Sequence, residues 1–170
     1  MIIIRKAKIK DALKIQKTIE PYAREGKMLH RPIYEVYENI RDYFVAIVNG
    51  KLVGCCALHV FGKEYNPMKN KKEEILAEIR GTAVAKKWQR KEIGSKLIKE
   101  CLKEAKDLDI TKVFVLIMEE NLDFFHKLGF KKTTKKKLPQ KIWQECIRCS
   151  RFPNECNETA LILTISQHAN

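Results

Sequence analysis

The feature that most constrains the fold is the near-continuous apolar run KVFVLIM, from Lys112 to Met118. A short run without polar alternation is typical of a strand that is buried on both faces. Such a strand needs neighbouring strands and a covering layer. Apolar residues that recur at helical spacing from Ile93 to Leu108 predict a long amphipathic helix that packs on the same sheet.

The remaining elements are predicted from periodicity and from turn residues. Strands are expected at residues 2–5, 43–48, 51–60, 76–84 and 160–165, and helices at 11–19, from Pro32 through IYEVYENIRD, in LDFFHKLGF and in LPQKIWQECI. The Asn49-Gly50 pair predicts a hairpin, Pro21 is expected to lie beyond its helix, and residues 62–73 are expected to form a polar loop. This order predicts an α/β or α+β fold, with a largely antiparallel sheet flanked by helices, in one domain that spans residues 1–170.

The composition limits the classes of partner. The 170 residues, 45% of them hydrophobic, are enough for one domain with a core. No apolar run approaches the length of a membrane span, and the N-terminus lacks the pattern of a signal peptide, so we expect a soluble cytoplasmic protein without a membrane partner. The net charge of +13 comes mainly from scattered lysines, which favours a solvated surface over a nucleic-acid interface.

The six cysteines form two groups in the sequence. The first group lies within apolar patterns and is expected to be buried: Cys55, Cys56 and Cys101. The second lies in the segment ECIRCSRFPNEC: Cys146, Cys149 and Cys156. A structural zinc needs a fourth ligand that this segment lacks, so no metal is expected and buried or redox-active thiols are the preferred interpretation.

The strand predicted at residues 76–84 has one charged and one apolar face. Strict alternation places Glu78, Arg80 and Thr82 on the charged face. These side chains could pair with each other and reach solvent, or they could line a cleft. A bulge would change the face of Thr82 and leave the two residues before it unaffected.

The turn WQRKEIGSKL, from Trp88 to Leu97, connects this strand to the long helix. Such a turn often binds phosphate, because the first amides of a helix have no partner within it. Phosphate-binding turns usually carry several glycines, whereas this one has Gly94 alone. Two interpretations stay open: a phosphate-binding turn, or an ordinary helix start in which Glu92 is favourable.

Taken in order, these segments resemble the GNAT superfamily of N-acetyltransferases. AEIRGTAV is similar to its central strand, WQRKEIGSKLIKECLKEA to its acyl-CoA pyrophosphate turn and helix, and VFVLIM with FFHKLGF to the strand and helix that follow. The likeness is strongest to the short N-acetylglutamate synthases. It runs from Ile4 to about Leu163 and includes PYAREGKMLHRPIYEVYENIRDYFVA, VNGKLVGCCALHV, LPQKIWQECIRC and FPNECNETALIL.

The resemblance implies acetyl-CoA as a co-substrate and a set of residues that bind it. The end of the strand would bind the pantetheine arm through backbone groups of Thr82, Ala83 and Val84. The turn would bind the pyrophosphate through Gln89, Arg90, Lys91, Ile93, Gly94 and Ser95. The family's first turn glycine is replaced here by Glu92, whose carboxylate would repel a diphosphate if it pointed inward.

The implied reaction is the attack of a neutral amine on a thioester, for which Glu78 is the candidate base. The implied acceptor is the α-amine of a small amino acid, glutamate first, as in arginine biosynthesis. Its carboxylates call for cations, and Arg80 and Arg31 are the candidates, although Arg31 could also be an ordinary surface arginine. Phe125 stands where the superfamily often has a proton-donating tyrosine.

Two alternatives stay beside this interpretation. One is an acetyltransferase with another amine acceptor, and the other is a non-catalytic module in which the altered turn no longer binds CoA. An exposed C-terminal strand could allow a homodimer.

Overall fold

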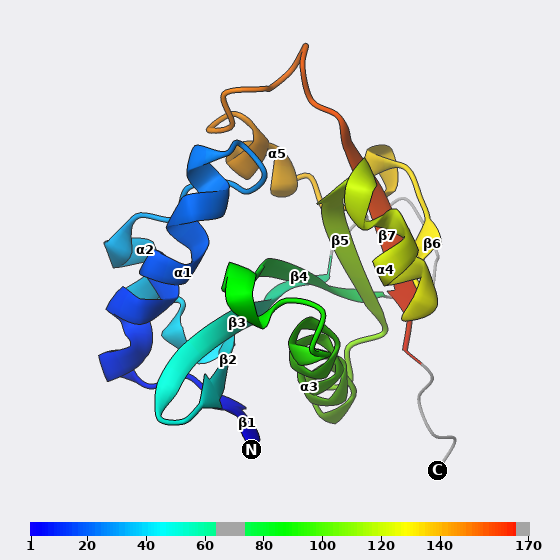
Figure 1. Ribbon diagram of the computed structural model, residues 1–170. Coiled ribbons are helices and arrows are strands. Elements are labelled where there is room, and N and C mark those ends of the chain that lie inside the picture. Colours follow the sequence, from blue (N-terminus) through cyan, green and yellow to red (C-terminus); the bar gives the residue numbers. More distant parts are fainter. Residues whose placement is uncertain (64–73, 166–170) are drawn as a thin grey trace. The chain divides into compact units, whose positions relative to one another are not determined.

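The computed structural model describes residues 1–63 and 74–165. Within them, seven strands are hydrogen-bonded in the order β1-β2-β3-β4-β5-β7-β6, and helices flank them (Figure 1). The strands are β1 (Ile2–Lys6), β2 (Tyr43–Val48), β3 (Lys51–Lys63), β4 (Ile75–Val84), β5 (Lys112–Met118), β6 (Lys131–Lys132) and β7 (Glu158–Thr164). Most of the described pairings are antiparallel, and β4 with β5 is parallel. The predicted fold class is confirmed.

The chain divides into two compact units, which we describe separately. The first unit comprises Met1–His59 and Ile79–Lys103, and the second comprises the described residues of Val60–Glu78 and Glu104–Asn170. The prediction of a single domain stays a prediction.

In the first unit, the hairpin between β2 and β3 forms as predicted. Asn49 and Gly50 both take left-handed angles, with φ of 48° and 73°. Two such residues in succession make the turn whose twist matches that of paired strands. The turn therefore fixes the antiparallel pairing of β2 with β3, which has one irregularity between Ala46 and Ile47.

The helices α1 (Ala12–Arg24) and α2 (Ile33–Glu38) cover one face of this part of the sheet. Their core contains Ile15, Ile19 and Val36, packed with Tyr43 and Val45 of β2.

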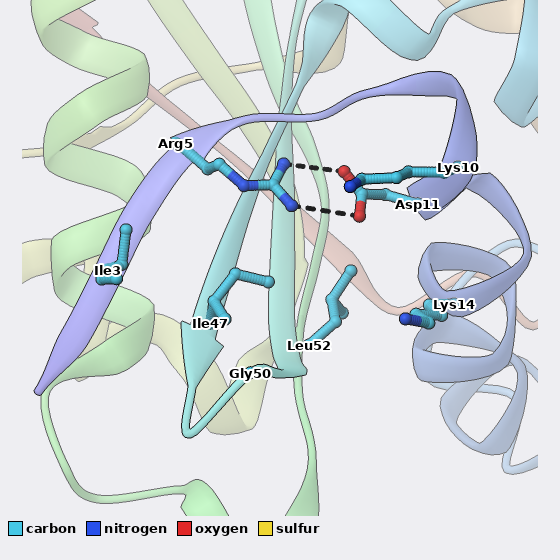
Figure 2. A pocket seen from close by; sticks show the side chains of 8 residues that line it. All are labelled: Ile3, Arg5, Lys10, Asp11, Lys14, Ile47, Gly50 and Leu52. Carbon is cyan, nitrogen blue, oxygen red and sulfur yellow. Dashed lines mark hydrogen bonds and ion pairs between the residues drawn. The ribbon is translucent and has the colours of Figure 1, made fainter.

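The predicted end of the first helix before Pro21 is wrong, because α1 continues through the proline to Arg24. Tertiary contacts hold this last turn: Tyr22 packs against the core, and its hydroxyl donates a hydrogen bond to the carbonyl of Val84. At the other end of α1, Arg5 pairs with the buried carboxylate of Asp11 at 2.7 Å (Figure 2).

The helix α3 (Ile93–Asp107) packs closely on β3 in the first unit. A Cβ atom at Gly54 would lie 3.1 Å from the Ala83 carbonyl oxygen, 3.2 Å from Cδ1 of Leu97 and 3.3 Å from Cγ2 of Ile93. A side chain at this position would therefore require its neighbours to shift by a few tenths of an ångström. The contact places the first turn of α3 against the end of β4.

Replacing Gly54 with valine is expected to lower the free energy of unfolding by about 1–3 kcal/mol, because the added methyl groups overpack this contact. Urea denaturation measures the change. Lys51→Val, at an exposed position of the same strand, is the control and should change stability by less than about 0.5 kcal/mol. Equal effects of the two substitutions would contradict the close packing.

In the second unit, β5 is the buried strand that the apolar run predicts. It pairs antiparallel with β7 and parallel with residues Leu76–Glu78 of β4. Phe114 is fully buried and packs in a core with Leu138, Ile142 and Ala160. The helices of this unit are α4 (Leu122–Lys127), where Gly129 follows the helix end at a φ of 92°, and α5 (Ile142–Cys146).

Several element bounds differ from the predicted ones. The helix predicted over LPQKIWQECI is shorter, the strand β6 was not predicted, and residues 62 and 63 belong to β3. The rest of the predicted polar loop, residues 64–73, lies outside the described residues. In the described part of the chain, no helix combines the length and the apolar character needed to cross a membrane.

Candidate active site

A left-handed glycine divides β4 into two parts. Gly81 has a φ of 61°, and a Cβ atom there would face Ile19 and Tyr43 at 3.6 Å. Ala83 is buried in the core of α1 and α2, whereas the Thr82 hydroxyl lies 3.1 Å from the sulfur of Cys56 on the other face. Thr82 and Ala83 therefore lie on opposite faces of the strand, and the placement of Thr82 on the face of Glu78 and Arg80 stays a prediction.

Two predicted substrate-binding arginines act on one hydroxyl. Burial, and to a smaller extent Cys55, raises the pKa of Tyr43, whereas the positive charges of Arg31 and Arg80 lower it. The Arg31 side chain is only 11% exposed and lies 3.6 Å from the carboxylate of Glu35. Arg31 is therefore not an ordinary surface arginine. The structure brings both cations within electrostatic reach of the Tyr43 hydroxyl.

Glu78 is a buried carboxylate, with 9% of its surface exposed. It precedes Arg80 by two residues in the same strand, on the part of β4 that comes before Gly81. Regular alternation before Gly81 predicts that these two side chains share one face. A buried acid next to a cation is a suitable group to accept a proton or to orient its neighbour.

The turn before α3 has the backbone that a glycine-rich turn would have. Arg90 and Glu92 take left-handed angles, with φ of 57° and 60°, which side chains other than glycine rarely adopt. The Glu92 side chain is 81% exposed and its carboxylate lies 3.9 Å from the ammonium of Lys96. The acid therefore points to solvent along the surface of the helix.

The first amides of α3 are positioned to bind an anion. The first closed bond of the helix is from the amide of Lys96 to the carbonyl of Glu92, at 3.0 Å. The amides of the three residues before it therefore lie at the open N-terminus: Ile93, Gly94 and Ser95. This end of a 15-residue helix fits a diphosphate through both its dipole and its donors.

Hydrogen bonds connect the turn to the end of α1, and the sequence did not predict them. The Tyr22 hydroxyl and the Gln89 side chain both donate to the carbonyl of Val84, the second at 3.2 Å, and Gln89 also donates to the Tyr22 oxygen at 2.8 Å. Nearby, Lys86 pairs with Glu25 at 2.7 Å. The only sequence signal was Tyr22 itself, which lies three residues after the apolar Ile19 and so shares its face of the helix.

Glycine at position 92 is expected to stabilise the turn without changing its binding of acetyl-CoA. The left-handed angle costs a side chain about 1–2 kcal/mol, and the entropy cost of glycine offsets about half of this. Glu92→Gly should therefore raise the free energy of unfolding by about 0.5–1 kcal/mol. Because the carboxylate points to solvent, titration calorimetry should give a dissociation constant within about twofold of the wild-type value.

Glu92→Ala is the matched control, since it removes the charge and keeps the strained angle. If both variants bound acetyl-CoA about tenfold more tightly, the acid would face the ligand, contrary to the structure.

Three other features were also predicted from the sequence. Phe125 is buried against Phe124 and Phe130, with ring centroids 5.2 and 5.5 Å apart, and has no proton to donate. Cys55, Cys56 and Cys101 are buried as predicted. In the described residues, no group of three or more His, Cys, Asp or Glu side chains is arranged to hold a metal ion.

A cavity of about 380 Å³ lies between β1, the β2–β3 hairpin and the start of α1 (Figure 2). Its lining contains none of the predicted site residues: it consists of Ile3, Arg5, Lys10, Asp11, Lys14, Ile47, Gly50 and Leu52. The cavity is therefore separate from the site on β4 and α3.

Comparisons with known proteins agree with this geometry. The acetyltransferase (GNAT) family model matches residues 9–130. An uncharacterized N-acetyltransferase of Chlorobaculum tepidum is 35% identical over 162 residues, which are 95% of this chain and 96% of that protein. An amino-acid acetyltransferase of Mycobacterium tuberculosis is 33% identical over 132 residues, which are 75% of this chain and 67% of that protein.

Two solved structures have a similar fold. N-acetylglutamate synthase from Neisseria gonorrhoeae, complexed with coenzyme A and N-acetyl-glutamate, matches with a TM-score of 0.79 and 22% identity over 98% of this chain and 36% of that chain. A Mycobacterium tuberculosis protein in complex with CoA matches with a TM-score of 0.75 and 26% identity over 96% of this chain and 99% of that chain. This chain spans about a third of the Neisseria protein.

The chain belongs to the GNAT acetyltransferase family. It is an N-acetyltransferase that uses acetyl-CoA, and its relatives include amino-acid acetyltransferases.

Proposed function

We propose that this enzyme transfers the acetyl group of acetyl-CoA to the α-amine of L-glutamate. The observation that carries the proposal is that Arg80 and the little-exposed Arg31 both exert their positive charge on Tyr43. An acceptor with two carboxylates requires more than one cation, and guanidinium groups bind carboxylates in a fork geometry.

The amide-rich start of α3 is proposed to hold the pyrophosphate of the co-substrate. The residues assigned to this role are Gln89, Arg90, Lys91, Ile93, Gly94 and Ser95. Backbone groups of Thr82, Ala83 and Val84 are proposed to bind the pantetheine arm. The exposed direction of Glu92 supports this proposal, because it leaves no carboxylate at the open helix end.

Acetyl-CoA, when bound, supplies a thioester carbonyl to the attacking amine. Glu78 is proposed to accept the proton of the acceptor ammonium, directly or through a water molecule, so that the amine is neutral when it attacks. The new C–N bond then replaces the C–S bond, the thiolate leaves, and the nitrogen loses its second proton to solvent. Phe125 cannot protonate this thiolate, so we assign no general acid.

Thiol release with a panel of amino acids tests the acceptor. We expect kcat/KM to be highest for L-glutamate, and lower for L-glutamine and for L-aspartate by at least about tenfold each, because each lacks the matching second carboxylate. Equal rates with glutamate and with an amino acid that has an uncharged side chain would refute glutamate as the acceptor. Arginine biosynthesis in the cytoplasm belongs to this proposal and depends on that result.

The alternative of a non-catalytic module is tested separately by calorimetry. Acetyl-CoA should bind with a dissociation constant in the micromolar range, which corresponds to about −8 kcal/mol. Binding no tighter than millimolar would support the module instead. The exposed Glu92 side chain and the open helix end both disfavour that alternative.

A further inference from the structure

The second unit contains a contact between a lysine and a cysteine that acetyl transfer does not use. The ammonium of Lys135 donates to the sulfur of Cys156 at 2.9 Å. Lys135 begins a short 3-10 helix, Lys135–Lys137, and Cys156 lies shortly before β7, so distant parts of the sequence form the contact. Cys156 is half-buried. The ammonium can stabilise the negative charge of the attacking sulfur through this hydrogen bond, and partial exposure admits small reagents.

Two more thiols belong to the same cluster. Cys146 ends α5 and is 8% exposed, and half-buried Cys149 follows it in a turn where its amide donates to the Cys146 carbonyl at 2.9 Å. Burial raises the pKa of the Cys146 thiol, Lys135 opposes this shift, and Cys156 and Cys149 add to it. None of the three thiols forms a disulfide in the structure. Among the described residues, no group of His, Cys, Asp or Glu side chains is arranged to hold a metal ion.

We propose that Cys156, held by Lys135, is a redox modification site that reacts with hydroperoxides and then forms a reversible disulfide with one thiol of the Cys146–Cys149 pair. In the first step, the Cys156 thiolate attacks the peroxide, an S–O bond forms, the O–O bond breaks, and the leaving oxygen takes a proton. In the second step, the partner thiol attacks the sulfenic sulfur, the S–S bond forms, and the S–O bond breaks with release of water. Two thiols are oxidised and the hydroperoxide is reduced. This inference is independent of the acceptor for acetyl transfer.

The sequence makes the products easy to map. Cleavage after Lys141, Arg148 and Arg151 places the three cysteines in three different peptides: IWQECIR, CSR and the C-terminal peptide that begins at Phe152. The reduced full-length protein is treated with one equivalent of hydrogen peroxide, alkylated, digested without reductant and analysed by mass spectrometry. We expect a disulfide-linked pair that contains the Cys156 peptide, and we expect dithiothreitol to reverse it.

Substitutions of neighbouring lysines test the role of the contact. Lys135→Met should slow the oxidation of Cys156 by about tenfold, because the thiolate loses its cation. Lys136→Met, one residue later in the same exposed basic segment, is the matched control and should leave the rate unchanged. Lys135→Arg keeps the charge and should restore most of the rate, which separates the electrostatic role from a loss of folding.

Three results would overturn the proposal. The first is alkylation of Cys156 and Cys149 at equal rates in the reduced protein. The second is oxidation of the Lys135→Met protein at the wild-type rate. The third is stoichiometric zinc in the purified protein that protects all three thiols from alkylation until a chelator removes it, since the cluster would then be a metal site.

Discussion

Replacing Arg80 with methionine raises the KM for glutamate by about 100-fold and leaves the KM for acetyl-CoA within about twofold of the wild-type value. A charge-assisted pair between a guanidinium and a carboxylate contributes about 1.5–3 kcal/mol, and each 1.4 kcal/mol is a tenfold change in affinity. Arg80 precedes the left-handed Gly81, and its charge acts on Tyr43, which lies beside that glycine. Its loss should therefore affect the acceptor and spare the co-substrate. Steady-state thiol release with each substrate varied in turn measures both constants.

The controls separate recognition from general damage. Arg41→Met removes an exposed arginine from the same unit and should leave both constants unchanged. Arg80→Lys keeps the positive charge but loses the fork geometry of the guanidinium group. We therefore expect it to recover less than half of the lost binding free energy. Equal increases of the two KM values in Arg80→Met would mean that the residue supports the fold of β4 rather than the acceptor.

The elements that were predicted correctly are those whose signal is local. The apolar run at Lys112–Met118 forms the buried strand β5. A strand buried in a sheet requires apolar side chains, and the local sequence already shows them. The signal for the Asn49-Gly50 turn is also local, because the two left-handed residues of the turn are enough to specify the hairpin. The helix from Ile93 ends within one residue of its predicted end for the same reason.

The errors arise where distant contacts override a local rule. Pro21 predicts a helix end, but the packing and hydroxyl bond of Tyr22 keep the next turn helical. In β4, Gly81 takes a left-handed angle, which no pattern of side chains reveals.

The direction of a side chain at the candidate site was also not predictable from the sequence. From the sequence, the carboxylate of Glu92 could face the ligand or the solvent. The backbone angle of Glu92 and its proximity to Lys96 in the structure direct it to solvent. The burial of Arg31 was not predictable either, because the segment around it has no periodicity that would indicate which residues face inward. The sequence therefore predicts candidate residues for the site, whereas the exposure and direction of their side chains come from the structure alone.

Replacing Glu78 with glutamine is expected to lower kcat by about 10²- to 10⁴-fold at neutral pH, the usual contribution of a general base. Glutamine keeps the size and the hydrogen-bonding capacity of the side chain and removes only its ability to take a proton. The acceptor would then have to lose its proton to bulk water before attack. Since the neutral fraction of an α-amine rises about tenfold per pH unit below its pKa, the rate of the variant should rise with pH at that slope.

This pH profile distinguishes a base from a residue that orients Arg80. If Glu78 only orients Arg80, the glutamine variant should behave like Arg80→Met, with a raised KM for glutamate and a pH profile parallel to that of the wild type. Glu74→Gln is the matched control, because Glu74 is an exposed acid just before the same strand and pairs with Lys112. It should leave kcat and the profile unchanged. A glutamine variant with kcat within about threefold of the wild-type value at pH 7 would exclude Glu78 as the base, because a positioned base contributes at least about 10²-fold.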